Sequence, residues 1–121
     1  MKRRNTSIRT RAEIQSIFRK GKLIRMGGLS VFYERAGLGV SRVLVTFPRV
    51  FKGAVRRNRV RRLFRECFRR QSHLFRGGGL DFIFLIFPQK AGVDYCEVET
   101  LMMTLFSDID KREVWGRTKE F

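Results

Sequence analysis

Apolar residues recur along this chain in two kinds of pattern, and the spacing of each pattern predicts the local structure. Between residues 55 and 70 the apolar side chains follow the i, i+3, i+4, i+7, i+8 spacing that lines one face of an α-helix. These residues are Val60, Leu63, Phe64, Cys67 and Phe68. The sequence therefore predicts a long helix with one buried face.

A shorter helix is predicted near the start of the chain. Thr10 and Glu13 have the spacing of a capping box, in which the two side chains satisfy backbone N–H groups at a helix start. Ile14, Ile17 and Phe18 follow at helical spacing, and Gly21 is a typical stop signal. We expect two or three turns of amphipathic helix between the cap and the glycine.

The last predicted helix begins near Asp94, where Glu97 stands three residues later as a first-turn acid. Its apolar stripe consists of Val98, Leu101, Met102, Leu105, Phe106 and Ile109. We interpret Met102 and the neighbouring Met103 as side chains that fill the core. This helix is expected to pack on a sheet.

Three segments have the composition of strands. Residues 29–33 follow a Gly-Gly pair, and residues 42–47 end at Pro48, which cannot donate a ladder hydrogen bond. These two strands are predicted to pair as a hairpin across a turn at residues 35–39. Residues 80–87 are apolar at nearly every position, which predicts a central strand covered on both faces.

The order helix, strand, strand, helix, strand, helix predicts the fold class. It indicates an α+β sandwich in which helices pack on one mixed or antiparallel sheet. A chain of 121 residues is large enough for one domain with its own core, so we expect residues 1–121 to form a single domain. Residues 1–9 are predicted to be a basic arm, and residues 112–121 a polar tail.

Charge changes the picture, because two segments carry almost all of it. The net charge is +16, of which residues 1–25 contribute +8 and residues 55–70 contribute +7. Opposite the apolar stripe of the long helix, the helical spacing places Asn58, Arg62, Arg65 and Arg69, with Arg61 at the edge. A cluster of arginines with Glu66 as its single acid predicts a surface for a polyanion. Arginine favours phosphate, which it can hold with two parallel hydrogen bonds.

Catalytic and metal-binding patterns are lacking in the sequence. The eleven acidic residues show no convergent carboxylates, and His73 is a single histidine that we interpret as a surface residue. Cys67 and Cys96 have no metal-ligand spacing, and we interpret both as reduced core thiols. The glycines at 77–79 lack the lysine of a phosphate-binding loop. We expect a protein that binds no cofactor, no metal ion and no small-molecule substrate.

The longest apolar stretch, residues 80–87, is too short to span a bilayer, and no apolar run of signal-peptide length follows the basic N-terminus. An anionic membrane surface is a competing polyanion. The predicted location is nevertheless the cytoplasm, with no membrane partner.

One run of residues resembles a known family. The positions that carry the resemblance are Phe51, Ala54, Arg57-Asn58-Arg59-Val60-Arg61-Arg62 and Arg65. This pattern is similar to the signature of the bacterial ribonuclease P protein component, and Phe18, Arg19 and Gly21 match the end of that family's first helix. The chain departs from the family where Thr46-Phe47-Pro48-Arg49 replaces a frequent Ser-Lys-Lys, and where Ile14 replaces a frequent aromatic residue.

The resemblance implies a fold and a function. It implies a sheet of about four strands and a left-handed βαβ crossover through the Arg-rich helix. It also implies an accessory subunit of an endoribonuclease, whose RNA subunit uses Mg²⁺ to remove the 5′ leader of precursor tRNA. The residues expected to contact the catalytic RNA are Arg57, Asn58, Arg59, Arg61, Arg62, Arg65 and Arg69. Those expected to contact the leader are Ile14, Phe18, Tyr33, Arg49 and Lys52.

Two other classes of protein fit the charge and the absence of catalytic residues. A ribosomal or other structural RNA-binding protein would share the size and basic surface. A DNA-binding module could place an arginine helix in a major groove, but the sequence has neither dimer signals nor a compact helical recognition unit. The ordered signature around Arg57 separates the ribonuclease P reading from the ribosomal one.

Overall fold

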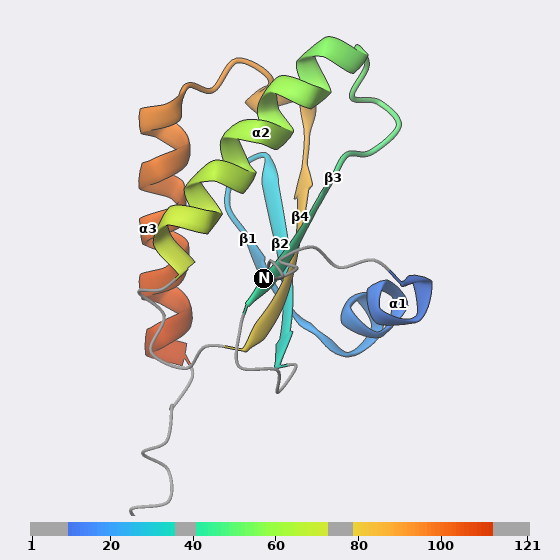
Figure 1. Cartoon of the computed structure of the whole chain (residues 1–121), viewed down its shortest axis with the longest axis vertical. Helices are drawn as coiled ribbons and strands as arrows, with labels where there is room; N and C mark the ends of the chain where they lie inside the picture. The colour runs from blue at the N-terminus through green and yellow to red at the C-terminus, as the bar shows by residue number, and fades with distance from the viewer. Residues whose placement is uncertain (1–9, 36–40, 73–78, 113–121) are drawn as a thin grey trace, which may run out of the picture.

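A four-stranded mixed sheet forms the centre of the computed structural model, which describes residues 10–35, 41–72 and 79–112 (Figure 1). The strand order is β1-β2-β4-β3. β1 (Lys22–Arg25), β2 (Leu29–Arg35) and β4 (Leu80–Ile86) pair antiparallel, and β3 (Arg42–Thr46) pairs in parallel with β4. The prediction of an α+β fold on a mixed sheet is confirmed.

The predicted hairpin between residues 29–33 and 42–47 is wrong, because β4 lies between β2 and β3. β4 is buried at six of its seven positions, so it takes a central place where both of its faces are covered, as predicted. The hairpin that does form joins β1 to β2. Its turn contains Gly27 at φ 30° and Gly28 at φ 80°, which are left-handed conformations that favour glycine.

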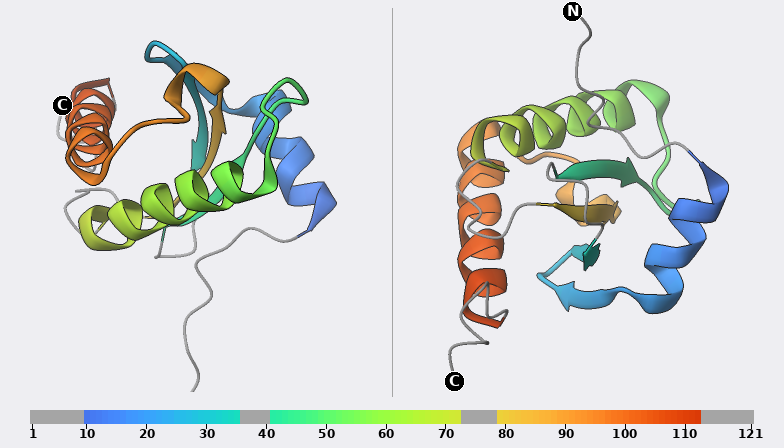
Figure 2. Two further views of the ribbon diagram at one scale, coloured as in Figure 1. Left: turned by 90° about the horizontal axis from the view of Figure 1, so that it is seen from above. Right: turned by 60° about the horizontal axis from the view of Figure 1, so that its bottom comes forward.

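Helices cover both faces of the sheet (Figure 2). α2 (Ala54–Gln71) and α3 (Tyr95–Arg112) lie on one face, and α1 (Arg11–Lys20) lies on the other. A short 3₁₀ helix, η2 (Pro88–Lys90), leads from β4 toward α3. Within the described ranges, no helix is long and apolar enough to cross a membrane.

The larger core lies between the sheet and the α2/α3 layer. Phe68 of α2 packs into a cluster of rings, because its ring centroid lies 5.3 Å from that of Phe82, 6.1 Å from that of Phe84 and 6.1 Å from that of Phe106. On the opposite face, Ile17 of α1 packs on Ile83 in a smaller cluster. The apolar faces predicted for α2 and α3 are therefore the buried ones, whereas α1 buries only Ile17 of its predicted face.

α2 is the connection between the two parallel strands β3 and β4, so the predicted βαβ crossover through the Arg-rich helix is present. The left-handedness of this crossover stays a prediction. The helix starts are also as predicted: Thr10 and Glu13 form a reciprocal capping box, and Asp94 and Glu97 exchange backbone hydrogen bonds of 2.9 and 3.0 Å.

Two residues predicted to be in the core are on the surface of α3. Cys67 is buried but Cys96 is exposed, and Met102 is buried while Met103 is 57% exposed. Positions 96 and 103 are two helical turns apart, so both lie on the outward face of the helix.

Some predictions concern residues outside the described ranges. They are the arm at residues 1–9, His73, the glycines 77 and 78, and residues 113–121 of the tail. Arg112 is the last residue of α3.

A charged network holds α1 on the sheet. The Arg42 guanidinium donates to both carboxylate oxygens of Asp81, at 2.9 and 2.7 Å, and to Glu13 of α1 at 3.1 Å. The Ser16 hydroxyl of α1 donates to Glu34 at 3.2 Å. Because Asp81 is 6% exposed, its charge needs this bidentate partner.

Gly21 ends α1 at a place with no room for a side chain. A Cβ atom there would lie 2.4 Å from the carbonyl oxygen of Ile17 and 2.8 Å from that of Tyr33. We expect Gly21→Ala to lower the free energy of unfolding by about 1–3 kcal/mol, measured by urea denaturation. Gly92→Ala is the matched control, since a Cβ at Gly92 meets nothing within 4 Å. Equal stability of the two variants would contradict the steric argument.

The network also predicts an acid dependence of stability. Partial burial disfavours the charge of Glu13, but the hydrogen bonds from Arg42 and Thr10 outweigh burial and lower its pKa below 4.5. The unfolded chain therefore binds the proton first, and this stabilisation is present above pH 4.5 and lost as pH falls through the lowered pKa.

We expect Glu13→Gln, which keeps a capping residue, to be less stable than the native chain near neutral pH and to approach it as the pH falls below 4.5. Thermal unfolding at a series of pH values measures the difference. Glu99→Gln, at an exposed position of α3, should show no such convergence. A Glu13→Gln deficit that stays constant with pH would contradict the assignment.

Candidate nucleic-acid interface

The outward face of α2 carries a row of arginines. Val60, Phe64, Cys67 and Phe68 turn inward and are buried, which forces the intervening residues outward. The exposed row consists of Asn58, Arg62, Arg65 and Arg69, here called the arginine ridge. Its composition and direction are those predicted from the spacing. Gly53, the N-cap of α2, provides no side-chain cap, and the first turn of the helix has no acid that would offset its positive charge.

The members of the arginine ridge differ in the hydrogen bonds and ion pairs that they make within the protein. Arg62 and Arg65 make no hydrogen bond or ion pair with any residue that the structure describes. Arg69 is paired with Glu66 at 2.8 Å. The two unpaired guanidinium groups are therefore the ones most available to a phosphate.

Arg61, at the edge of the ridge, is partly committed to the fold. It donates to the Asn58 side chain at 2.7 Å, and its guanidinium carbon lies 5.1 Å from the centre of the Phe47 ring. Burial, together with repulsion from Arg65 and Arg57, lowers the pKa of Arg61. Phe47 also packs on Phe51 with ring centroids 4.7 Å apart. Phe47 therefore supplies packing to the loop before α2 and to the first turns of the helix.

Two arginines of the Arg57-Asn58-Arg59 motif brace loops: one the loop before α2, the other the segment before α3. Arg57 donates to the Phe51 carbonyl at 3.1 Å, in the loop before the helix. Arg59 donates to the carbonyls of Ala91 and Val93 at 3.2 and 2.6 Å, in the segment before α3. Sequence reasoning assigned both residues to RNA alone and missed this second role, which depends on where distant carbonyls lie.

The other face of the sheet presents aromatic side chains beside α1. Phe18 is 43% exposed and packs edge-to-face on Phe32, with ring centroids 4.8 Å apart. Tyr33, which was predicted to contact the leader, is 2% exposed and lies in the larger core beneath α2 and α3. Its ring cannot stack on a base there, so the Tyr33 prediction is wrong. Successive strand residues face opposite sides, and Phe32 is the aromatic residue of β2 on the α1 side.

The remaining predicted leader residues lie at different places around α1 and β3. Ile14 is half-buried against the small cluster of Ile17 and Ile83. Arg49 and Lys52 are exposed in the loop between β3 and α2. This loop joins β3 to α2, the helix that carries the arginine ridge.

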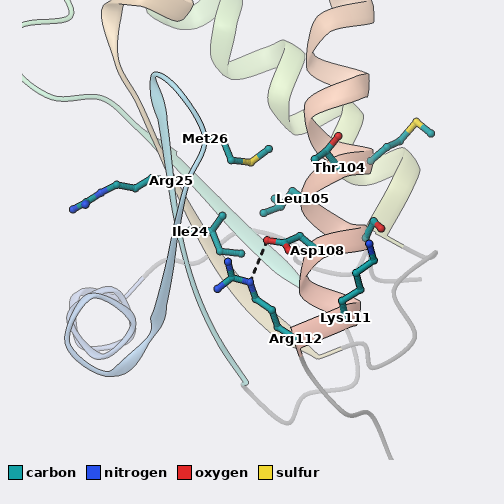
Figure 3. Close-up of a pocket in the computed structure, with 10 residues that line it drawn as sticks. Ile24, Arg25, Met26, Thr104, Leu105, Asp108, Lys111 and Arg112 are labelled. Atoms are coloured by element: carbon teal, nitrogen blue, oxygen red, sulfur yellow. Dashed lines mark hydrogen bonds and ion pairs between the residues drawn. The ribbon is translucent and has the colours of Figure 1, made fainter.

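Two recesses hold none of the predicted site residues. One, of about 500 Å³, lies between β1 and α3, where Ile24 and Met26 face Leu105 and the Asp108–Arg112 ion pair of 3.1 Å (Figure 3). The other surrounds the Arg42 network. Among the residues that the structure describes, no three His, Cys, Asp or Glu side chains are grouped to hold a metal ion.

A basic helix backed by a mixed sheet, with the exposed Phe18 ring on the opposite face, is typical of a nucleic-acid-binding protein. Comparison with known proteins gives the particular family. The family model described as Ribonuclease P matches residues 1–110. The ribonuclease P protein components of Borrelia hermsii and Borrelia turicatae are 55% and 52% identical over 114 residues, which is 94% of this chain and 100% of each relative.

The solved structure of the RNase P protein from Thermotoga maritima superposes with a TM-score of 0.76 at 27% identity, covering 86% of this chain and 97% of that chain. The chain therefore belongs to the ribonuclease P protein family, whose members are protein subunits of the ribonucleoprotein endoribonuclease that matures the 5′ ends of tRNA. Membership of this family implies RNA binding and a partner ribonuclease P RNA.

Some of these arginines are bonded within the protein and others are not, and this difference predicts different effects of their replacement. Replacing Arg62 or Arg65 by alanine should change the free energy of unfolding by less than about 0.5 kcal/mol, because neither side chain is bonded within the described structure. Each should reduce the slope of log affinity for RNA against log salt by about 0.7–0.9. Arg59→Ala should instead lower stability by about 1 kcal/mol, because two backbone carbonyls lose their donor.

Urea denaturation and salt-dependent binding to ribonuclease P RNA measure the two effects. The division fails if Arg62→Ala and Arg65→Ala unfold as readily as Arg59→Ala, or if their salt slopes equal that of the native chain.

Proposed function

We propose that the chain docks on the catalytic RNA of ribonuclease P through the arginine ridge and holds the 5′ leader of precursor tRNA on the aromatic surface beside α1. The observation that carries the proposal is the pair of unbonded guanidinium groups of Arg62 and Arg65, on a helix with a net charge of +7 over residues 55–70. Such groups fit phosphate oxygens, and the family supplies the RNA.

The contacts of α2 with the RNA would serve different purposes. Arg62 and Arg65 would hold backbone phosphates, which gives affinity without reading sequence. Asn58, already accepting from Arg61 at 2.7 Å, keeps amide donors for an RNA hydroxyl or base edge. Arg57 and Arg59 would add phosphate contacts with the N–H groups that their loop carbonyls do not occupy.

The leader surface would be built from Phe18 and Phe32. An exposed aromatic ring can stack on any base, which suits a leader whose sequence varies between substrates. Arg49 and Lys52, exposed in the loop between β3 and α2, would pair with leader phosphates. Ile14 supports α1 from beneath, so its contribution would be positional.

On this proposal cleavage belongs to the RNA subunit and to the Mg²⁺ ions that the RNA holds. The ions would activate the attacking water and stabilise the leaving oxygen. This chain would supply no acid, base or metal ligand to that step. Its residues would bind the RNA, orient the leader and neutralise phosphates, which lowers the Mg²⁺ concentration that the RNA needs.

Reconstitution with a bacterial ribonuclease P RNA tests the proposal. The protein should allow cleavage of precursor tRNA at a Mg²⁺ concentration too low for the RNA alone, and purified protein should cleave nothing by itself. Cleavage by the protein without RNA, abolished by replacing an acidic residue, would overturn the assignment of catalysis. No change in the Mg²⁺ requirement would overturn the docking role.

Replacement of Phe18 by alanine separates the two surfaces. We expect binding of precursor tRNA to the holoenzyme to weaken by about 1–3 kcal/mol if one base stacks on this ring. Affinity for mature tRNA and assembly with the catalytic RNA should stay nearly unchanged. Met103→Ala removes a similarly exposed apolar side chain from α3 and is the control. Equal losses of affinity for precursor and mature tRNA would contradict the assignment of Phe18 to the leader.

A further inference from the structure

A recess between α2 and the beginning of α3 is unexplained by phosphate binding. It has a volume of about 400 Å³ and is lined by Arg59, Arg62, Leu63, Glu66 and Tyr95. Glu66 is the single acid of the segment 55–70, and a carboxylate repels phosphate. Because Glu66 lines the recess, the ligand group that fits there is one other than phosphate.

The aromatic wall of the recess is held in place on several sides. Tyr95 is the first residue of α3 and lies within the reciprocal cap formed by Asp94 and Glu97. The segment before it is fixed by the two carbonyl hydrogen bonds of Arg59. The guanidinium carbon of Arg70 lies 5.8 Å from the centre of the Tyr95 ring. The ring is thus positioned before any ligand arrives.

Glu66 keeps an acceptor for a ligand. Arg69 and Arg70 donate to it at 2.8 and 2.9 Å, and both bonds end on the same oxygen, Oε2. The other oxygen, Oε1, makes no hydrogen bond with the part of the chain that the structure describes. The two arginine hydrogen bonds lower the pKa of Glu66, so the carboxylate is ionised at neutral pH and can only accept.

We propose that this recess binds one unstacked nucleobase of the bound RNA, with the base against Tyr95 and Leu63 and its exocyclic amino group donating to Glu66. The inference rests on the proposed docking of α2 on RNA. A planar base fits an aromatic and aliphatic wall, and bases splayed out of single-stranded RNA are commonly recognised by stacking on aromatic rings. Arg62, at the rim and on the arginine ridge, holds the phosphate next to that base.

The acceptor makes the recess selective. Cytosine and adenine present an exocyclic amino group, and pairing of a carboxylate with the cytosine amino group is a recurrent contact. Uracil presents a carbonyl oxygen at the same place, which a carboxylate repels. The recess therefore favours a base with an amino group and disfavours uracil.

Tyr95→Leu removes the aromatic face while keeping apolar volume, and Tyr95→Phe keeps the ring. In binding to ribonuclease P RNA, Tyr95→Leu should lose about 5-fold to 150-fold in affinity, and Tyr95→Phe less than about 3-fold. Arg62→Ala and Arg65→Ala, measured together with them, test the underlying proposal. If these two lose affinity and Tyr95→Leu does not, the nucleobase site is overturned and the docking role stands. If none of them loses affinity, the docking role fails as well.

A fluorescence measurement tests the nucleobase site directly and does not depend on the stability of Tyr95→Leu. The double variant Tyr95→Trp, Trp115→Phe carries one tryptophan, placed in the recess. Its fluorescence should be quenched by short single-stranded RNA of cytidine at concentrations at least about 5-fold lower than by RNA of uridine. Adding Glu66→Gln should remove that difference, because an amide can accept from cytosine and donate to uracil. Absence of quenching, or a preference unchanged by Glu66→Gln, would overturn the proposal.

Discussion

Burial of one face of α2 against the sheet is the interaction on which the rest of this structure depends. Eight arginines in residues 55–70 repel one another, and like charges one helical turn apart cost a few tenths of a kcal/mol per pair. Each fully buried apolar side chain contributes about 1.5–3 kcal/mol, and α2 buries Val60, Phe64 and Phe68 completely or nearly so. Packing therefore outweighs repulsion, and the charges are held close together on a rigid surface before an RNA is present.

The two faces of the sheet are stabilised by different means. The α2/α3 side has a continuous cluster of phenylalanine rings, whereas α1 is held by a small apolar cluster and the charged network of Arg42. The position of Phe18 therefore depends on a guanidinium group that bonds Asp81 of the central strand. The arginine ridge, in contrast, stands on the main core, so its geometry is insensitive to the state of α1.

Sequence patterns predicted the features that are set locally. Helix spacing and capping residues predicted the three described α-helices, and the apolar run at residues 80–87 predicted the central strand. β1 was not predicted, because Ile24 is the only buried residue among its four and the strand therefore shows no alternation of apolar and polar residues. Phe32 and Tyr33 are adjacent aromatics, so the sequence could not tell which faces α1; the pairing of Tyr33 with Phe82 decides it. The carbonyls that Arg59 bonds lie 32 and 34 residues away, and no local signal identifies them.

The crossover through α2 also bears on how quickly the chain reaches this fold. Arg42 and Asp81 are neighbours in the finished sheet but 39 residues apart in sequence, so the β3–β4 pair cannot form until a long loop has closed. A formed α2 shortens the flexible part of that loop, yet its arginines resist forming a helix in isolation. A polyanion that neutralises them removes this resistance, and RNA would then act as a template for folding of the subunit that serves it.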